Sequence, residues 1–210
     1  MKIIKVLSFL IFTLLLCACV KHMPARSSVT ERFSNDDTSD GVVLISFSAP
    51  KNLWFYTCSI EIINVDTKVR TWLSGSFLQP DLTDDSVKVV YKAVELPEGD
   101  YHILNWQIYR GQSKFVPLGI FTIPFTVRSG HINYIGDYMG LLKNKAGKTP
   151  VFMPPTDVYF EVSDRFNSDA DMFESKFKHL DLSNVLNAMP DFSGSNTKYS
   201  LMYLKGINIP

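Results

Sequence analysis

The sequence predicts a mainly β protein, an antiparallel β-sandwich followed by a helical hairpin. Apolar and polar residues alternate with a period of two in about seven to nine short stretches between residues 41 and 162, and turn residues follow each stretch. The apolar spacing becomes helical only after residue 163. Because no helical pattern separates the strands, a parallel α/β sheet is not expected.

The expected strands succeed one another at short intervals. They span residues 41–49, 53–64, 68–77, 87–93, 101–110, 116–127, 131–139, 158–162 and 199–204. Pro124 inside the sixth of these stretches indicates an edge strand or a bulge. Cys58 falls on the apolar face of the second stretch, so we expect it in the core as a small hydrophobic residue. A reactive thiol is the alternative interpretation of this cysteine.

The strand expected over residues 101–110 separates two kinds of side chain. Trp106 and its alternate neighbours are expected to face the core. The aromatic and polar side chains of the other face make up a candidate ligand face: Tyr101, Asn105, Gln107 and Tyr109.

A helical hairpin is expected over residues 168–189. Ser168 can cap the first helix, and Asp169 and Asp171 would lie in its first turn, where acidic side chains suit the helix dipole. The second helix would end at Pro190. We therefore divide the chain into a sandwich over 41–162 and a C-terminal helical extension and tail over 163–210.

The first 19 residues have the pattern of a secretory signal. Two lysines, Lys2 and Lys5, precede an apolar run over residues 6–16, and small residues follow. The run is too short for the roughly 20 residues that cross a bilayer as a helix. We expect a cleaved signal peptide over 1–18 and a flexible polar tether over 19–40, whose r.m.s. reach is roughly 25 Å.

Leu16-Cys17-Ala18-Cys19 resembles the lipoprotein box of bacteria, with Cys17 where alanine, serine or threonine is usual. The resemblance implies cleavage before Cys19 and lipid on that residue. Two or more acyl chains anchor a protein stably to a membrane. In Gram-negative sorting, aspartate at the next position retains a lipoprotein at the inner membrane, and here that residue is Val20, so the outer membrane is expected. The alternative is an ordinary signal peptide that ends near a cysteine.

Composition excludes several classes of protein. The full chain carries 21 basic and 21 acidic residues, and loss of residues 1–18 leaves a formal charge of −2, so no basic excess favours nucleic acid. An apolar content of 46% can fill a packed core. If Cys19 carries lipid, Cys58 has no partner within the mature chain, and a disulfide framework is not expected.

Two motifs resemble a known family. Leu96-Pro97-Glu98-Gly99-Asp100-Tyr101 resembles the leucine–proline–x–glycine–x–tyrosine hairpin of transthyretin-like, or carboxypeptidase-regulatory-like, sandwiches. Residues 125–136 resemble the strand–glycine–strand of bacterial lipoproteins of that type, in which Tyr-Ile-Gly precedes a polar residue, here Asp137. The resemblance covers roughly residues 41–190 and implies a prealbumin-like fold with a stabilising or binding role. It supplies no functional residues to transfer.

The sequence offers no constellation typical of catalysis. His22, His102, His131 and His179 are not paired at metal-ligand spacing. Carboxylates around residues 164–171 lack the central glycine of a calcium loop, and helix capping explains them more simply. We therefore predict no catalytic residue, metal or cofactor.

Three hypotheses follow for the function. The first is a non-catalytic envelope lipoprotein, held to the membrane by its N-terminal lipid, that binds another envelope protein or helps to assemble it. The second is a glycan or small-molecule binder that uses the candidate ligand face. The third is a hydrolase with a dispersed site.

Overall fold

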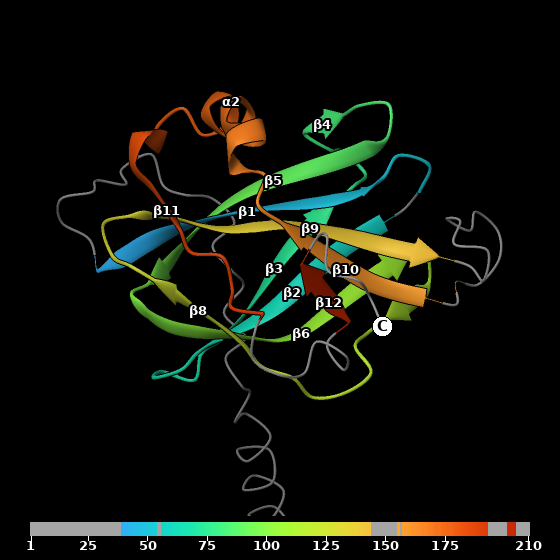
Figure 1. Ribbon diagram of the computed structural model, residues 1–210, viewed down its shortest axis with the longest axis horizontal. Coiled ribbons are helices and arrows are strands. Elements are labelled where there is room, and N and C mark those ends of the chain that lie inside the picture. The colour runs from blue at the N-terminus through green and yellow to red at the C-terminus, as the bar shows by residue number, and fades with distance from the viewer. Residues whose placement is uncertain (1–38, 54–55, 144–154, 156, 193–200, 205–210) are drawn as a thin grey trace, which may run out of the picture.

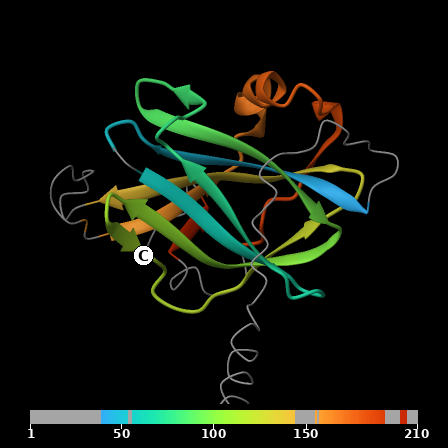
Figure 2. The same ribbon diagram turned by 180° about the vertical axis from the view of Figure 1, so that it is seen from behind.

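A computed structural model describes residues 39–53, 56–143, 155, 157–192 and 201–204. The expected signal peptide, Cys19 and nearly all of the expected tether lie outside the described residues. Two β-sheets pack face to face, and an α-helix covers the outer face of one of them (Figures 1 and 2). The prediction of a mainly β, two-sheet fold is confirmed.

The larger sheet, sheet A, has seven strands within the described part of the chain. Its strands are β1 (Asp40–Pro50), β4 (Leu82–Thr83), β5 (Val87–Pro97), β9 (Ile132–Lys143), β10 (Asp157–Ser163), β11 (Val185–Asn187) and β12 (Met202–Leu204). The order is β12-β10-β9-β1-β5-β4, and β11 pairs with β9 beyond the end of β10. The sheet is mixed, because β1 and β11 run parallel to β9 and β12 runs parallel to β10.

Sheet B is antiparallel and, among the residues that the structure describes, has five strands. They are β2 (Tyr56–Asn64), β3 (Arg70–Ser76), β6 (Gly99–Arg110), β7 (Ser113–Phe115) and β8 (Ile123–Val127). β7 and β8 pair with successive parts of β6, in the order β3-β2-β6-β7 with β8 farther along β6. Pro124 therefore lies on an edge strand, as its position in the sequence predicts.

Two segments that read as hairpins in the sequence are corners between the sheets. β5 pairs with β1 in sheet A, whereas β6 pairs with β2 in sheet B, so Pro97-Glu98-Gly99 carries the chain from one sheet to the other. Gly99 has φ +147°, a value that suits glycine. The turn at Ser129 and Gly130 likewise connects β8 of sheet B to β9 of sheet A. The hairpins expected here are wrong because local turn chemistry does not specify which neighbour a strand pairs with.

Sheet A is buried on both faces. Val43, Ile45 and Phe47 of β1 face the core between the sheets. Val42 and Leu44 alternate with them and face a second apolar cluster beneath the helix. A central strand buried on both sides is a nearly continuous apolar run, which is the pattern of residues 42–47.

The helix α2 (Phe166–Lys176) anchors the second cluster. Phe173 is fully buried, and its ring meets Tyr91 of β5 edge-on at 4.9 Å between centroids. The helix begins at Phe166, earlier than the expected cap at Ser168, and the Asp164 side chain accepts a hydrogen bond from the Phe166 N–H at 3.1 Å. The N-cap residue is therefore Arg165, whose side chain makes no capping hydrogen bond, and Asp164 just before it supplies the side-chain acceptor.

The second helix of the expected hairpin does not form. Residues 182–184 make a single 3₁₀ turn, η1, and the chain then joins sheet A as β11. Pairing with Ile132, Asn133 and Tyr134 of β9 overrides the helical spacing of the apolar residues. The C-terminal segment is therefore part of sheet A, and β12 lies within the final strand expected over residues 199–204.

Two β-bulges set which side chains face which layer. In β9, Ile135 and Gly136 together oppose a single residue of β1, because Leu44 pairs with Tyr134 and Ser46 with Asp137. In β6, Leu104 is the extra residue opposite β2. A bulge reverses the alternation of side chains beyond it, so each one redirects half of a strand.

Candidate functional site

The four residues of the candidate ligand face do not form one surface. Tyr101 is 3% exposed, stacks on Phe125 and donates a hydrogen bond to the Pro97 carbonyl at 2.8 Å. Asn105, Gln107 and Tyr109 remain partly exposed on the outer face of sheet B. The bulge at Leu104 separates these two groups, because it shifts the alternation of side chains along β6. Tyr101 and Ile103 face the core before the bulge, and Trp106 faces the core after it. The placement of Tyr101 on the outer face was wrong.

A groove of about 720 Å³ opens between β8 of sheet B and the chain around β11 of sheet A. Met189 and Phe125 supply part of its apolar lining. Its polar side chains come from three separate parts of the sequence and are Asp100, His102, Thr126, Arg128, His131, Asn133, Asn187 and Asp191. The groove was not predicted, because the corner at residues 128–131 and the pairing of β11 bring these parts together.

One rim of the groove is fixed by Asn133. Its side-chain carbonyl accepts a hydrogen bond from the Arg128 N–H at 3.0 Å, and its amide donates to the carbonyls of Arg128 and His131 at 3.1 and 3.0 Å. Asn133 is fully buried, so these bonds are protected from water. The turn between β8 and β9 is therefore held in one conformation.

His131 has a defined tautomer. Its Nδ1 lies 2.7 Å from the Ser129 carbonyl oxygen, which can only accept a hydrogen bond. Nδ1 must therefore carry a proton, and in the neutral ring Nε2 is the hydrogen-bond acceptor. The Ser129 hydroxyl donates to Glu98 at 3.0 Å, so this serine is not bonded to the imidazole.

The groove carries charges of both signs. Asp100 and Asp191 are exposed carboxylates, and Arg128 is an exposed cation. Thr126 donates a hydrogen bond to Asp100 at 2.7 Å, and the Asp191 N–H donates to the Pro124 carbonyl at 2.9 Å, which joins the C-terminal segment to β8. Such a lining suits a ligand with hydrogen-bonding and charged groups of both signs.

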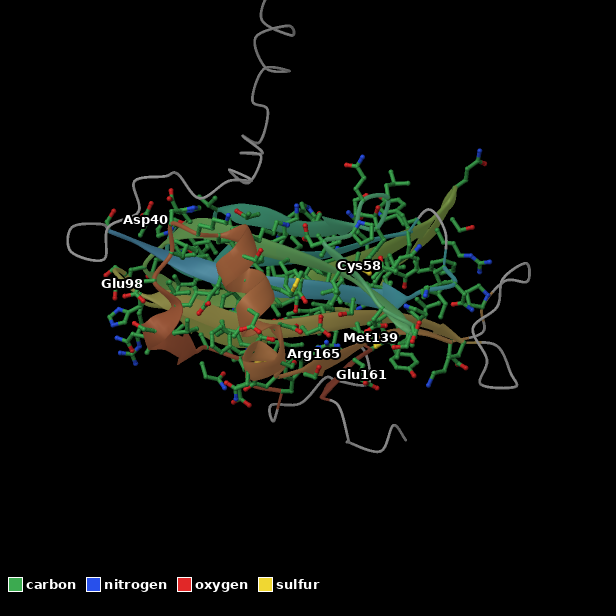
Figure 3. All side chains as sticks on the ribbon, turned by 90° about the horizontal axis from the view of Figure 1, so that it is seen from above. Asp40, Cys58, Glu98, Met139, Glu161 and Arg165 are labelled. Carbon is green, nitrogen blue, oxygen red and sulfur yellow. The ribbon has the colours of Figure 1, made fainter. Side chains whose placement is uncertain are left out.

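The groove lies at the end of the sandwich where β1 begins. The Gly130 N–H donates to the Asp40 carbonyl at 3.1 Å, and the Glu98 N–H donates to the Ser39 carbonyl at 3.1 Å. Asp40 and Glu98 lie together at this end (Figure 3). The first described residues of the chain are thus beside the groove rim.

A buried polar cluster lies on the outer face of sheet A, the face that α2 covers. Asp137 is 1% exposed, and its Oδ1 accepts hydrogen bonds from the hydroxyls of Ser48 at 2.6 Å and Ser46 at 3.0 Å. Burial raises the pKa of Asp137 to about 6, although both hydroxyls and the charge of Arg165 act in the other direction. The β9 bulge directs Asp137 to this face, and Gly136 within a strand was the signal for it.

The positive charge of Arg165 acts on the Asp137 carboxylate from the start of the helix. It lies at the start of α2 (Figure 3) and pairs with Asp169 at 3.2 Å. Asp169 is 2% exposed, and among the described atoms its Oδ2 has no hydrogen-bond partner. The Arg165 N–H donates to the Tyr134 hydroxyl at 3.1 Å. One half-buried cation thus pairs with Asp169 and acts through its charge on Asp137, so Asp169 has a larger role than the first-turn acid that the sequence predicts.

Cys58 is fully buried in the core, as predicted. Burial raises the pKa of its thiol well above the usual value. The thiol is therefore held in its neutral, unreactive form.

The described residues contain no group of three or more histidine, cysteine, aspartate or glutamate side chains that could hold a metal ion. Nor does any helix in the described ranges have the length and apolarity to cross a membrane.

Comparisons with known proteins give no family. No protein-family profile and no curated protein matches this sequence. Among solved structures, a candidate cell adhesion protein from Parabacteroides distasonis matches 58% of this chain and 41% of its own, at 12% identity and TM-score 0.30. A leucine-rich repeat protein from Bacteroides thetaiotaomicron matches 73% and 19%, at 16% identity and TM-score 0.30. This chain spans less than half of either protein, and scores this low carry no argument about fold or function.

Proposed function

We propose that this protein is a non-catalytic, lipid-anchored envelope protein that binds a segment of another envelope protein in the groove beside β8. The observation that carries the proposal is the groove itself, which is open, of mixed charge and framed by a rigid rim. The lipid anchor at Cys19 and an outer-membrane location belong to the same proposal and rest on the lipoprotein box.

A peptide segment fits the groove better than a small molecule does. Small-molecule sites are enclosed and mainly apolar, with a few polar groups. This groove is open and lined by Asp100, Arg128 and Asp191, which are all exposed. Peptide recognition commonly combines pockets for side chains with polar contacts along a strand edge, and β8 is an edge strand.

The glycan-binding alternative loses its main support. It rested on a row of aromatic and polar side chains, and Tyr101 is withdrawn into the core. The three that remain are partly engaged with one another or with the backbone. The Tyr109 hydroxyl donates to Gln107 at 3.2 Å, and Asn105 accepts from the Trp106 N–H at 2.9 Å.

The chemistry of the groove favours binding over catalysis. Among the described residues, no serine, threonine or cysteine side chain is hydrogen-bonded to His102 or His131. A hydrolase of the serine or cysteine type needs such a pair within about 3 Å. Ser129, the nearest hydroxyl in sequence to His131, donates instead to Glu98.

Site-specific photocrosslinking in the intact envelope tests the groove. A benzophenone side chain at Asn187, which lines the groove, should give a discrete adduct with one protein, and the same group at exposed Asp171 on α2 should not. Charge reversal by Arg128→Glu should abolish the adduct because it makes the groove uniformly acidic, and Lys178→Glu on the far side should leave it unchanged. An adduct that forms equally at both positions, or that survives Arg128→Glu, overturns the proposal.

The anchor is tested separately by mass. The purified membrane form should begin at Cys19 and carry the mass of its acyl chains. An unmodified cysteine, or a chain that retains residues 1–18, contradicts the anchor and leaves the groove experiment to decide the binding role.

A further inference from the structure

The segment that joins β7 to β8 presents a row of apolar side chains to solvent. Val116 is 48% exposed, Leu118 75% and Ile120 94%. The residues between them, Pro117 and Gly119, are half-buried, so exposure alternates along the segment and the larger apolar side chains face outward. Isolated exposed apolar residues are ordinary, but three in one row are not.

The charged residues near this row in the sequence have one sign. Residues 101–136 contain no aspartate or glutamate, and they include Arg110, Lys114 and Arg128. Lys114 precedes the row by two residues, and its Nζ lies 5.7 Å from the centre of the Tyr109 ring. An apolar row beside cations and a tyrosine is the composition of protein surfaces that enter the headgroup region of a membrane.

We propose that the contact edge, residues 113–120, rests on an anionic lipid surface, with Leu118 and Ile120 inserted among the headgroups and Lys114 on the phosphates. The inference rests on the proposed lipid anchor, which would hold the fold near a bilayer. The contact edge runs along the side of the molecule opposite α2 (Figures 1 and 2). A tether with a reach of roughly 25 Å allows the sandwich to lie on this side.

The acidic residues along β8 lie outside the contact edge. Two carboxylate residues lie beside β8, since Thr126 donates a hydrogen bond to Asp100 and the Asp191 N–H donates to the Pro124 carbonyl. The outward row continues from Ile120 through Thr122, Pro124 and Thr126, all exposed, and becomes polar only there. Residues 121–123 therefore separate the apolar part of the row from Pro124, where the first of these two acidic residues lies.

Depth-dependent fluorescence quenching tests the proposal on the lipidated protein reconstituted into vesicles with phosphatidylglycerol. Leu118→Cys, Ile120→Cys and, as the control on α2, Asp171→Cys each receive an environment-sensitive fluorophore, because Cys58 is buried and Cys19 would be acylated. Doxyl-labelled lipids should quench the dye at 118 and 120 and shift its emission to the blue, and the dye at 171 should report water. Identical spectra at all three positions overturn the proposal.

Two matched changes test the forces separately. Leu118→Ser should lower the docked-to-free ratio of a dye at residue 120 by roughly tenfold, since one buried leucine is worth about that much in partitioning. Lys114→Glu should lower it several-fold in anionic vesicles and have a much smaller effect in vesicles of phosphatidylcholine alone. Equal docking to both lipids by the parent protein contradicts the electrostatic part.

Other occupants of the contact edge give different results. A blue shift without vesicles, with a dimer in sedimentation, shows that two copies of the chain pack through this edge and overturns the lipid assignment. If mass shows no lipid on Cys19, the labelled chain is added to vesicles from solution. Quenching at 118 and 120 then supports the lipid contact and counts only against the anchor.

Discussion

Asp137 offers the sharpest test of the buried polar cluster. Burial raises the pKa of this carboxyl to about 6 in the folded protein, against an ordinary value near 3.8. The folded state therefore binds the proton more tightly than the unfolded chain does. The stability linked to this group is fully present below about pH 4 and is lost as pH rises toward about 6, after which it stays low.

The magnitude follows from the difference of about two pKa units. At 1.36 kcal/mol per unit, ionisation of Asp137 lowers the free energy of unfolding by about 3 kcal/mol at neutral pH, of which about 2.5 is lost between pH 4 and 7.5. Asp137→Asn keeps an acceptor for the hydroxyls of Ser46 and Ser48 but cannot ionise. The variant should therefore gain about 2.5 kcal/mol relative to the parent over this pH interval.

Urea unfolding at several pH values, followed by the fluorescence of buried Trp106, measures this difference directly. Other titrating groups are present in both proteins and largely cancel in the comparison, and the charges of Arg165 and Asp169, which act on Asp137 from the start of α2, are present in both as well. Asp171→Asn, on the exposed side of α2, should follow the parent at every pH. The reasoning is refuted if the difference between Asp137→Asn and the parent stays constant from pH 4 to 7.5.

Three further outcomes test the packing. Phe173→Ala should lower the free energy of unfolding by about 3–5 kcal/mol in urea titrations, because a fully buried ring leaves a cavity; a loss below 1 kcal/mol would mean that α2 does not need it. Gly136→Ala should lower the free energy of unfolding by several kcal/mol in the same assay, since φ is +110° and the added Cβ would meet Met189. Gly111→Ala, where the added Cβ would meet open space, should lower it by about 1 kcal/mol, and equal losses for the two variants would contradict this reasoning. Cys58 should react with a thiol reagent only at the rate of unfolding, and rapid reaction of the native protein would contradict its burial.

The sequence predicted those features that depend on local pattern. The two-residue period located most of the strands, and the apolar face of the second strand placed Cys58 in the core. Pro124 marked an edge strand because proline cannot donate a ladder hydrogen bond. The nearly continuous apolar run at residues 42–47 also indicated that β1 is buried on both faces, although we expected apolar and polar side chains to alternate there.

Features that depend on pairing between distant strands were missed. A strict period of two placed Tyr101 outside, because nothing local shows that Leu104 has no partner in β2. The apolar spacing after residue 182 fits a helix, yet β9 has a free edge there that accepts β11. The groove depends on both local pattern and distant pairing, since His102 and His131 come to line the same groove only after the chain changes sheets at two corners. Single residues could be assigned from the sequence, but their assembly could not.

The two proposed surfaces can be separated by mutation although they share one stretch of chain. The segment from β7 to β8 exposes an apolar row at residues 116–120, and the same outward row lines the groove at Thr126. Leu118→Ser removes apolar area far from the groove, whereas Arg128→Glu changes the charge of the groove without touching that row. If the membrane only holds the groove in position, Leu118→Ser should weaken crosslinking to a partner near the membrane but leave binding of that partner in detergent intact. Arg128→Glu should abolish both the crosslinking and the binding in detergent. Loss of binding in detergent by Leu118→Ser would instead mean that the partner itself covers the contact edge, and the lipid assignment would then be wrong.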